Sequence, residues 1–437
     1  VVFGILAGLT PPDVRCVLYD ERREPLPLEE PTELVALTVE TAPARRAYEI
    51  AGHYLDRGIP VVLGGYHPTL SPQEALQYAS SIVIGDAEEV WPMVVEDVRR
   101  GRLRRVYQRR FPSLERCVVD RSIFRGKGYR RLAFVQFGRG CRYACDFCSI
   151  HAFYGANRRW RPLATVIEEV RSLRGRHVLF CDDNLFNDRA RFEALLDALE
   201  PLRMRWSCQI SLDVAASPDL LHRMAKAGCL SMVIGLESLD AGNLRQMRKS
   251  WNRAHGSYDE LLAAIRREGI MVYAGFVLGY DHDTVETFEN TLEFAIRNRL
   301  FLANFNPLAP TPGAALHDRL RAEGRLIHDP WWLHEDYRYG QSMFHPRRMT
   351  AEELAAGCYH ARTVFNRWQN VVYRMRDREA NFGSLYKAAT FLLANLVSRR
   401  EIHRKQGRRL GSGTPLAPRF SAEACQRELA AMPSAGA

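Results

Sequence analysis

Three cysteines occur in one short segment of the chain, as Cys141, Cys145 and Cys148. Ten cysteines scattered at random along the chain would give this spacing with an expected count of roughly 0.005, so the grouping is a real pattern. An iron–sulfur cluster usually takes four thiolates, and the next cysteine, Cys181, follows only at the end of a predicted strand. Three thiolates leave one iron open, much as a catalytic zinc keeps one coordination position free. The spacing therefore indicates a metal cluster that serves catalysis.

A structural zinc ion or a disulfide would use the same cysteines in another way. Zinc sites usually pair two short cysteine runs or add histidines, whereas this chain has no second C-x-x-C and only His151 lies nearby. The low cysteine density and a start unlike a signal peptide argue against disulfides and predict a reducing, cytoplasmic location. Cys181 as a fourth ligand is less favoured, because a buried strand cysteine usually acts as a small apolar residue. Gly138 and Gly140 let the backbone fold tightly where side chains would crowd a cluster.

The pattern C-x-x-x-C-x-x-C with an aromatic residue, Phe147, before its last cysteine resembles the signature of the radical S-adenosylmethionine (SAM) superfamily. The resemblance implies that the three cysteines hold a 4Fe-4S cluster whose open iron is chelated by SAM. Electron transfer then cleaves SAM to a 5'-deoxyadenosyl radical, a reaction of the cofactors that the protein positions and shields. A reductant such as a flavodoxin or ferredoxin is the implied partner.

After the cysteines, short apolar runs alternate with helical patterns, which predicts an α/β fold with a parallel sheet. Six such units match the partial (β/α)6 TIM-like barrel of this superfamily, where chemistry takes place at the carboxyl ends of the strands. The predicted strands are 132–137, 177–181, 205–210, 230–235, 271–278 and 301–306, and the predicted helices are 163–174, 189–200, 218–228, 257–268 and 284–299.

Polar residues and glycines follow these strands, and the resemblance places SAM there. Its amino group is expected near the second strand, its ribose and carboxylate near the third and fourth, and its adenine near the fifth. The chain departs from the common Gly-Gly-Glu after the second strand and has Asp182-Asp183-Asn184, similar to a variant of cobalamin-binding members. For each residue alone, a turn or a helix cap without any ligand is the alternative. The predicted SAM residues are Phe147, Asp183, Gln209, Glu237, Ser238 and Gly275.

The N-terminal part forms a separate predicted unit, with strands at 34–39, 59–63 and 81–84 and helices at 43–57 and 71–79. Glycines directly after strands can mark a ligand at the strand ends, but taken alone they favour tight turns without a ligand. Residues 61–69, 72–75 and 85–88 resemble the cobalamin-binding domain that precedes the radical SAM core in one subfamily. The implied cobalamin residues are Thr38, Gly64, Gly65, His67, Gly85 and Glu88.

The motif D-x-H-x-x-G, whose histidine binds cobalt in other cobalamin proteins, is absent, so His67 is not expected to be such a ligand. The chain begins without methionine, and its first nine residues read as a helix instead of the first strand of a Rossmann-like domain. We therefore expect the cobalamin-binding domain to be incomplete. The predicted domains are a cobalamin-binding unit at 1–112, a linker at 113–130, the radical SAM core at 131–328, a helical domain at 329–409 and a disordered tail at 410–437.

The net charge of +10 is weak support for nucleic-acid binding, because only five of the 61 basic residues are lysine and this skew is typical of GC-rich coding sequences. The basic runs at 99–110 and 398–409 read as solvated linker and helix surface. Helices are expected at 350–368 and 384–398, after the paired tryptophans Trp331 and Trp332. No apolar run approaches the roughly 18 residues that span a membrane.

These patterns predict a radical SAM enzyme that transfers a methyl group from cobalamin to an unactivated carbon of a small-molecule or natural-product substrate. Rearrangement, cyclisation or methylthio transfer by the same radical is one alternative, although a methylthiotransferase needs a second cluster and the N-terminal part offers only Cys16 and Cys117. An alternative of another class is a non-catalytic iron–sulfur electron carrier or nucleic-acid-binding protein. No single residue is predicted as a catalytic acid, base or hydrogen-abstraction site.

Overall fold

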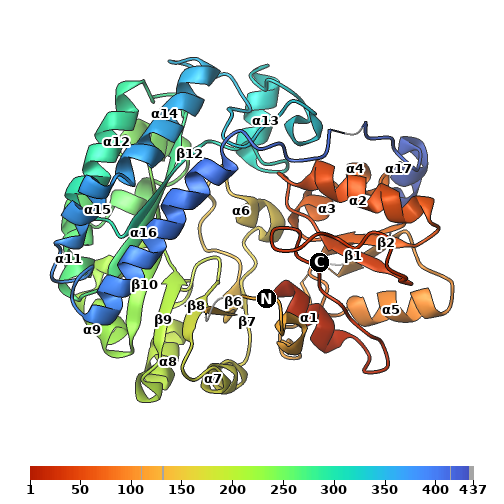
Figure 1. Ribbon diagram of the computed structural model, residues 1–437, viewed down its shortest axis with the longest axis horizontal. Helices are drawn as coiled ribbons and strands as arrows, with labels where there is room; N and C mark the ends of the chain where they lie inside the picture. Colours follow the sequence, from red (N-terminus) through yellow and green to blue (C-terminus); the bar gives the residue numbers. More distant parts are fainter. Residues whose placement is uncertain (110, 130–131, 414, 433–437) are drawn as a thin grey trace.

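The computed structural model describes residues 1–437 except 110, 130–131, 414 and 433–437. It has the α/β architecture with parallel sheets that the sequence predicts, arranged as two lobes (Figure 1). The lobe at the right of the view contains a four-stranded sheet, and the lobe at the left contains a six-stranded sheet. Within the described ranges, no helix is long and apolar enough to cross a bilayer.

The four-stranded sheet is parallel, and its strands stand in chain order, β1 to β4. The helices that precede, connect and follow these strands are α1 (Val2–Leu9), α2 (Ala44–Asp56), α3 (Tyr66–Leu70), α4 (Pro72–Leu76) and α5 (Trp91–Arg99). The strands are β1 (Val35–Thr38), β2 (Val61–Gly64), β3 (Ser81–Gly85) and β4 (Val106–Arg109). Strand β4 lies in the basic run 99–110, so the prediction of a linker there is wrong. The side chain of its Tyr107 is buried against the sheet, and this burial stabilises the segment as a strand.

Both faces of this sheet are covered, because successive strand residues point to opposite faces. Val61 and Leu63 face α2 and α4, together with Trp331 and Trp332 from the C-terminal part. On the other face, Val62 and the neighbouring residues of β3 pack on α5. Burial on both faces explains why the sequence shows unbroken apolar runs instead of an alternating pattern.

The six-stranded sheet is also parallel and runs β12-β11-β10-β9-β8-β5, which is the reverse of chain order without a crossing. Its strands are β5 (Leu132–Val135), β8 (His177–Phe180), β9 (Arg205–Gln209), β10 (Cys229–Glu237), β11 (Met271–Leu278) and β12 (Leu302–Pro307). The helices of this part are α6 (Ser149–Tyr154), α7 (Leu163–Ser172), α8 (Arg189–Leu199), α9 (Pro218–Lys226), α10 (Ala241–Gln246), α11 (Tyr258–Arg267), α12 (Glu286–Arg297) and α13 (Ala315–Ala322). All six carboxyl ends therefore lie at the same edge of the sheet.

A short antiparallel pair, β6 (Gly138–Arg139) with β7 (Arg159–Trp160), flanks the cysteine segment. The remaining short elements are 3-10 turns at Ser122–Phe124, Glu200–Leu202, Leu212–Ala216, Ser250–Arg253 and Trp331–Leu333. The predicted linker is not free of contacts, since Leu114 and Cys117 pack against Ile5 of α1.

The C-terminal helices α14 (Ala351–Phe365), α15 (Trp368–Met375) and α16 (Leu385–Lys405) pack against the outside of the six-stranded lobe, next to β12 and α12. Arg374 of α15 joins these helices to the six-stranded lobe. Its side chain is fully buried and donates to the carbonyl oxygens of Leu300, Phe301 and Phe365 and to Oδ1 of Asn395, at 2.9–3.0 Å. These acceptors are neutral, and burial lowers the pKa of the guanidinium to about 9.

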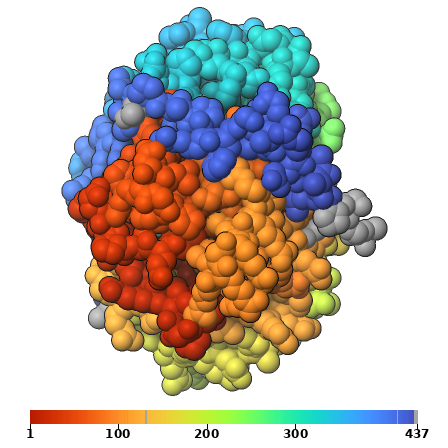
Figure 2. All heavy atoms as spheres, turned by 90° about the vertical axis from the view of Figure 1, so that its right-hand side faces the viewer, coloured from red at the N-terminus to blue at the C-terminus, as the bar shows by residue number. Residues whose placement is uncertain are grey.

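The prediction of a disordered tail at 410–437 is wrong for most of that range, while residues 414 and 433–437 lie outside the described residues. Residues Ala422–Ala430 form α17, which contacts α4, and Cys425 is fully buried. The backbone N–H of Arg419 donates to the carbonyl of Gln77 at 2.8 Å. Figure 2 shows this blue segment lying against the red and orange N-terminal lobe. The tail is rich in small residues, which is why its sequence reads as disordered. Its Phe420, Cys425 and Leu429 nevertheless pack on the buried cluster around Tyr48.

Replacing Arg374 with methionine tests the joint between the C-terminal helices and the sheet. The Arg374→Met variant keeps an apolar side chain of similar reach but leaves four buried acceptors without their donor, so we expect the free energy of unfolding to fall by about 3 kcal/mol or more. Urea denaturation followed by circular dichroism measures the loss. Arg376→Met, at an exposed neighbouring position, is the matched control, and an equal effect of both substitutions would contradict this role.

Candidate active site

The three cysteines lie on the segment between β6 and α6, at the carboxyl edge of the six-stranded sheet. All ten cysteines of the chain are free thiols, so no disulfide forms. Burial raises the pKa of the Cys141, Cys145 and Cys148 thiols, that of Cys145 to about 12. Charge on one of these thiols also raises the pKa of another, so they lie within electrostatic range of one another. A metal cluster would have to displace their protons.

Three thiols within electrostatic range of one another fit the donor set of a cluster. Among the described residues, no three His, Cys, Asp or Glu side chains are gathered around a single metal-ion position. The thiolates of a 4Fe-4S cluster bind separate iron atoms and therefore stand further apart than the ligands of one ion. The cysteine segment thus fits a cluster better than the zinc ion considered from the sequence.

Residues directly after β8 hold the backbone of the cysteine segment. The carboxylate of Asp182 accepts from the N–H groups of Phe137 at 2.8 Å and Gly138 at 2.5 Å, and Asp183 accepts from Gly140 at 2.7 Å. Burial raises the pKa of Asp182 to about 7 and that of Asp183 to about 6, although these hydrogen bonds act in the opposite direction. The predicted SAM residue Asp183 therefore also positions the segment that carries the cysteines.

Two asparagines after β8 also bind the cysteine segment. The side chain of Asn187 accepts from the N–H of Arg142 at 2.9 Å and donates to the carbonyl of Gly140 at 2.6 Å. Asn184 places its Nδ2 at 3.8 Å from Sγ of Cys141 and at 3.1 Å from Oγ of Ser211. The first cysteine is thus fixed on both sides of its peptide by the segment after β8.

Gly140 is required by the backbone and its neighbour. Its φ is +85°, and a Cβ at this position would lie 2.1 Å from the carbonyl oxygen of Asn157. A Cβ at Gly138 would meet the ring of Trp160 at 2.8 Å. The sequence predicted that glycines here leave room for a metal, whereas the contacts in the structure are with β7 and the residues before it. A left-handed backbone in such close contact strongly favours glycine.

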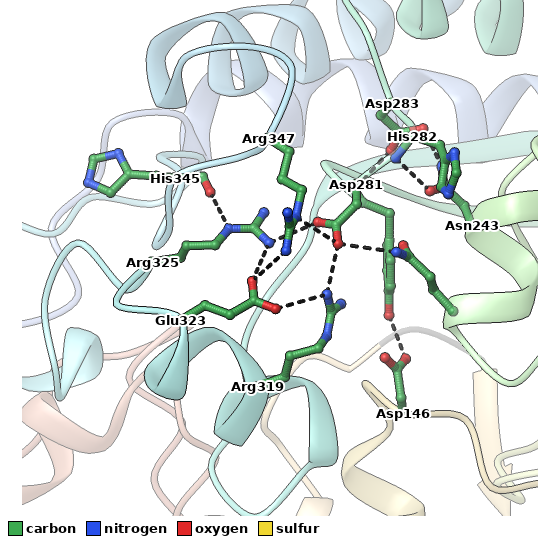
Figure 3. Close-up of polar contacts among 12 residues, drawn as sticks. Asp146, Asn243, Asp281, His282, Asp283, Arg319, Glu323, Arg325, His345 and Arg347 are labelled. Carbon is green, nitrogen blue, oxygen red and sulfur yellow. Dashed lines mark hydrogen bonds and ion pairs between the residues drawn. The ribbon is translucent and has the colours of Figure 1, made fainter.

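The other end of the cysteine segment is held by the end of β11. The hydroxyl of Tyr280 donates to Oδ1 of Asp146 at 2.6 Å, and the N–H of Leu316 in α13 donates to the carbonyl of Asp146 at 3.0 Å. Figure 3 shows this contact beside Asp281, which binds three arginines. The guanidinium groups around Asp281 are those of Arg319 and Arg325 at 2.8 Å and of Arg347 at 3.1 Å. The cysteines therefore sit on a segment held at both ends.

Glu237 and Lys249 form a buried ion pair next to the cysteines. Glu237 has a φ of +65°, and its Oε1 lies 3.1 Å from Nζ of Lys249. A Cβ at Gly235 would lie 2.0 Å from Oε1 of Glu237, so this glycine makes room for the carboxylate, and Gly275 lies on its other side, where a Cβ would be 3.8 Å from Oε2. The positive charge of Lys249 lowers the pKa of all three cysteine thiols.

Sequence reasoning missed Lys249. One sign of it was available, because lysine is so rare in this arginine-rich chain that each of the five stands out. Of the predicted SAM residues, the structure brings Glu237 and Gly275 together, while Asp183 and Gln209 meet through a 3.1 Å hydrogen bond from Nε2 to the Asp183 carbonyl. Their contacts with SAM remain predictions.

Ser238 and Phe147 have other partners in the structure. The hydroxyl oxygen of Ser238 accepts from the N–H of Asp240 at 3.1 Å and from Nδ2 of Asn243 at 3.5 Å, in the turn before α10. This is the role in a turn that the alternative predicted. The ring of Phe147 packs edge-on against Tyr280, with centroids 6.4 Å apart, and this contact supports the cysteine segment.

A cavity of about 1170 Å³ lies between the two sheets. On one side it is bounded by residues at and near the carboxyl ends of β1 to β3, and on the other by β5 and α6. Five of the six predicted cobalamin residues line it, namely Thr38, Gly64, Gly65, Gly85 and Glu88. Opposite them stand Leu132, Phe134, Phe153 and Tyr154.

Of the six predicted cobalamin residues, His67 is not among those that line this cavity. The side chain is fully buried on the far side of α3, where Nε2 lies 3.0 Å from Oη of Tyr48 and 3.0 Å from Oε1 of Glu74. The ring of Trp332 packs edge-on against it, with 5.5 Å between centroids. The short helix α3 turns this side chain away from the strand ends and into the core.

The chain is similar in sequence to a known family and to known proteins. The Radical SAM superfamily model matches residues 135–295, which span the cysteines and the strands from β8 to β11. Bacteriochlorophyllide d C-12(1)-methyltransferase of Chlorobaculum tepidum is 28% identical over 362 residues, which cover 80% of this chain and 78% of that protein. Hopanoid C-2 methylase of Rhodopseudomonas palustris is 30% identical over 301 residues, covering 63% of this chain and 54% of that protein.

A solved structure has a similar fold. It is the radical SAM methyltransferase TsrM from Kitasatospora setae with cobalamin and a [4Fe-4S] cluster bound, with a TM-score of 0.54, 18% identity and 68% of each chain covered. The cysteine segment, the parallel sheet behind it and these similarities confirm the resemblance drawn from the sequence: residues 135–295 form a radical SAM domain, and the chain is a radical SAM enzyme.

Proposed function

We propose that this enzyme transfers a methyl group from cobalamin to an unactivated carbon of a small molecule. The cavity between the two sheets is the observation that carries the proposal. Its volume of about 1170 Å³ exceeds the roughly 300–1,000 Å³ of ordinary ligand pockets. It lies over the carboxyl ends of β1 to β3, where doubly wound sheets bind their ligands. A corrin macrocycle is a ligand of the size and shape that such a space accommodates.

In this proposal each lobe has its own task. The six-stranded lobe, about 131–328, is the partial (β/α)6 barrel that holds the cluster and SAM. The four-stranded lobe, about 1–112, is the Rossmann-like cobalamin-binding unit, joined to the barrel by 113–130, and residues 329–409 form the helical cover. When bound, the cluster and SAM supply the 5'-deoxyadenosyl radical, and cobalamin supplies the methyl group.

The chain's own residues hold these groups in place. Cys141, Cys145 and Cys148 would bind the cluster, and the residues after β8 fix the backbone on which these thiols stand. Lys249 and Glu237 offer SAM a cation for its carboxylate and a carboxylate for its amino group. Both are nearly buried, with side chains 9% and 12% exposed, so their charges act in a medium from which water is largely excluded.

A tetrapyrrole is the substrate class that we propose to test first. The similarity to the bacteriochlorophyllide methyltransferase extends over 80% of this chain, against 63% for the hopanoid methylase. A longer shared region includes more of the segments that contact a substrate. Support for a tetrapyrrole therefore comes from the length of the similar region. The sequence identity does not favour it, since it is 28% for the bacteriochlorophyllide methyltransferase and 30% for the hopanoid methylase.

Cysteine variants test the cluster. Cys145→Ala removes one of three thiolates, so we expect anaerobically reconstituted protein to lose most of its iron and to form no 5'-deoxyadenosine from SAM and dithionite. Cys181→Ala is the matched control, because this thiol also lies at the carboxyl edge of the sheet but donates to the carbonyl of Val135 at 3.3 Å. Loss of the cluster in the Cys181→Ala protein would show that the ligand set proposed here is wrong.

The charge of Lys249 is expected to set the reduction potential of the cluster. A nearby cation favours the reduced, more negative cluster, so Lys249→Met should lower the midpoint potential by about 50 mV or more, where about 59 mV corresponds to a tenfold change for one electron. Redox titration followed by electron paramagnetic resonance measures it. Lys249→Arg keeps the charge and should remain close to the wild type, and a potential that is the same in all three proteins would refute the assignment.

Product analysis tests the reaction itself. Reconstituted enzyme with hydroxocobalamin, reductant, methyl-labelled SAM and bacteriochlorophyllide d should give 5'-deoxyadenosine and a pigment that has exchanged one hydrogen for a labelled methyl group, seen by mass spectrometry. Omission of cobalamin should abolish methylation. Radical formation with a product of unchanged carbon count would instead favour rearrangement or cyclisation, and methylation of a hopanoid alone would refute the tetrapyrrole.

A further inference from the structure

The outer face of helix α16 is apolar, where the outer face of a surface helix is normally polar. Leu385, Leu393 and Leu396 are 87%, 55% and 46% exposed, and Ala389 is exposed as well. These four positions follow one another at intervals of three or four residues, so their side chains lie on one face of the helix. The side of α16 that packs on the lobe carries the buried residues Ala388, Phe391 and Asn395. The first half of α16 is therefore apolar on both sides, although only one side is covered.

No charged side chain interrupts this apolar face. Between Leu385 and Val397 the only charged residue is Lys387, and its Nζ turns toward the six-stranded lobe, where it donates to the carbonyl of Gly269 at 2.5 Å. Exposed apolar side chains normally occur singly, and a row of them marks a contact surface. A helix that is apolar all round is normally covered all round. The outer face of α16 therefore fits a partner that takes up leucine side chains.

The neighbouring helix α15 widens this surface. Its Trp368 and Val372, one helical turn apart, are each about half exposed. The guanidinium of Arg399 in α16 lies 5.6 Å from the centroid of the Trp368 ring and donates to the carbonyl of Asn366 at 3.2 Å. An exposed tryptophan and an arginine thus stand side by side where the two helices meet, on the outside of the six-stranded lobe (Figure 1).

The carboxyl-terminal end of α16 and the turn after it are basic. Their only acidic residue is Glu401, and their cations are Arg399, Arg400, Arg404, Lys405, Arg408 and Arg409. Glu401 pairs with Arg404 at 2.7 Å and with Lys405 at 3.4 Å. Arg400 stands one turn beyond Leu396 on the same face of the helix, is exposed, and forms no ion pair with any described residue. Leucines that end in cations on one helix face are typical of helices that lie on a membrane surface.

We propose that the outer face of α15 and α16 is a docking surface for a membrane that contains anionic lipids. The leucines and Trp368 lie in this arrangement between headgroups and acyl chains, and the arginines lie at the phosphates. Nucleic acid would pair with the arginines but leave the leucines in water. A second copy of the chain would cover the leucines but bring a second set of the same cations to the interface, where like charges repel. Anionic lipids match both the apolar and the basic part.

Sedimentation with vesicles tests this surface. The cluster-loaded full chain should bind vesicles of phosphatidylcholine and phosphatidylglycerol, and pure phosphatidylcholine at least about tenfold more weakly. Leu393→Asn/Leu396→Asn removes two apolar side chains from the surface, so we expect affinity for the anionic vesicles to fall at least about tenfold. Met93→Asn/Val118→Asn is the matched control, because both side chains are similarly exposed but belong to the N-terminal part of the chain. Its affinity should stay within about threefold of the wild type.

Trp368 reports which face of the protein touches the lipid. Brominated acyl chains quench the fluorescence of a tryptophan that they contact, so they should quench the wild type, and Trp368→Phe should lose most of this quenching. A wild type that binds no vesicles, leucine substitutions without effect, or the same quenching in Trp368→Phe would overturn the inference. A lipid-free dimer that the leucine substitutions dissociate, seen by analytical ultracentrifugation at unchanged melting temperature, would overturn it in favour of a second copy of the chain.

Discussion

The hydrogen bonds from the backbone of residues 137–142 to the side chains after β8 are the interaction on which the site depends. Asp182, Asp183 and Asn187 take up four N–H groups and one C=O group that a strand leaves unpaired where it ends. A loop that binds a cluster cannot pair its backbone with a neighbouring strand, and buried backbone groups require partners. The side chains after β8 provide them and so fix the backbone on which the cysteines stand.

The strands were predictable because they stand in the sequence as short apolar runs bounded by polar residues and glycines. Strand β11 was predicted residue for residue, and β5, β8, β9 and β12 agree within two residues at each end. The cysteine segment and the residues at the strand ends were predictable for a related reason, since parallel strands bring their carboxyl ends to one edge. Glu237 and Gly275 illustrate this, being distant in sequence and adjacent in the structure.

Contacts between segments that no periodicity connects were not predictable. The buried face of α17 packs on α4, more than 300 residues earlier in the chain, and its small residues look like a disordered tail when read alone. His67 follows two glycines at a strand end, as ligand residues do, but α3 directs it to Glu74 and Trp332. Lys249 lies between α10 and the 3-10 turn at Ser250–Arg253, and only the fold brings it to Glu237. In each case the partner decides the role of the residue.

Three consecutive residues connect the cavity with the cysteines. The side chain of Arg139 binds Asp86 and Glu88 at the cavity wall, the N–H of Gly140 binds Asp183, and Cys141 carries the first thiol. Neighbouring Cα atoms are about 3.8 Å apart across a trans peptide, and the backbone at Gly140 is held on both sides. The two peptide units between Arg139 and Cys141 therefore have little conformational freedom. A displacement of the cavity wall at Arg139 would displace the first thiol as well. The distance between a ligand in the cavity and the reactive end of the six-stranded sheet is consequently set by this short segment and by the ion pairs that join the lobes.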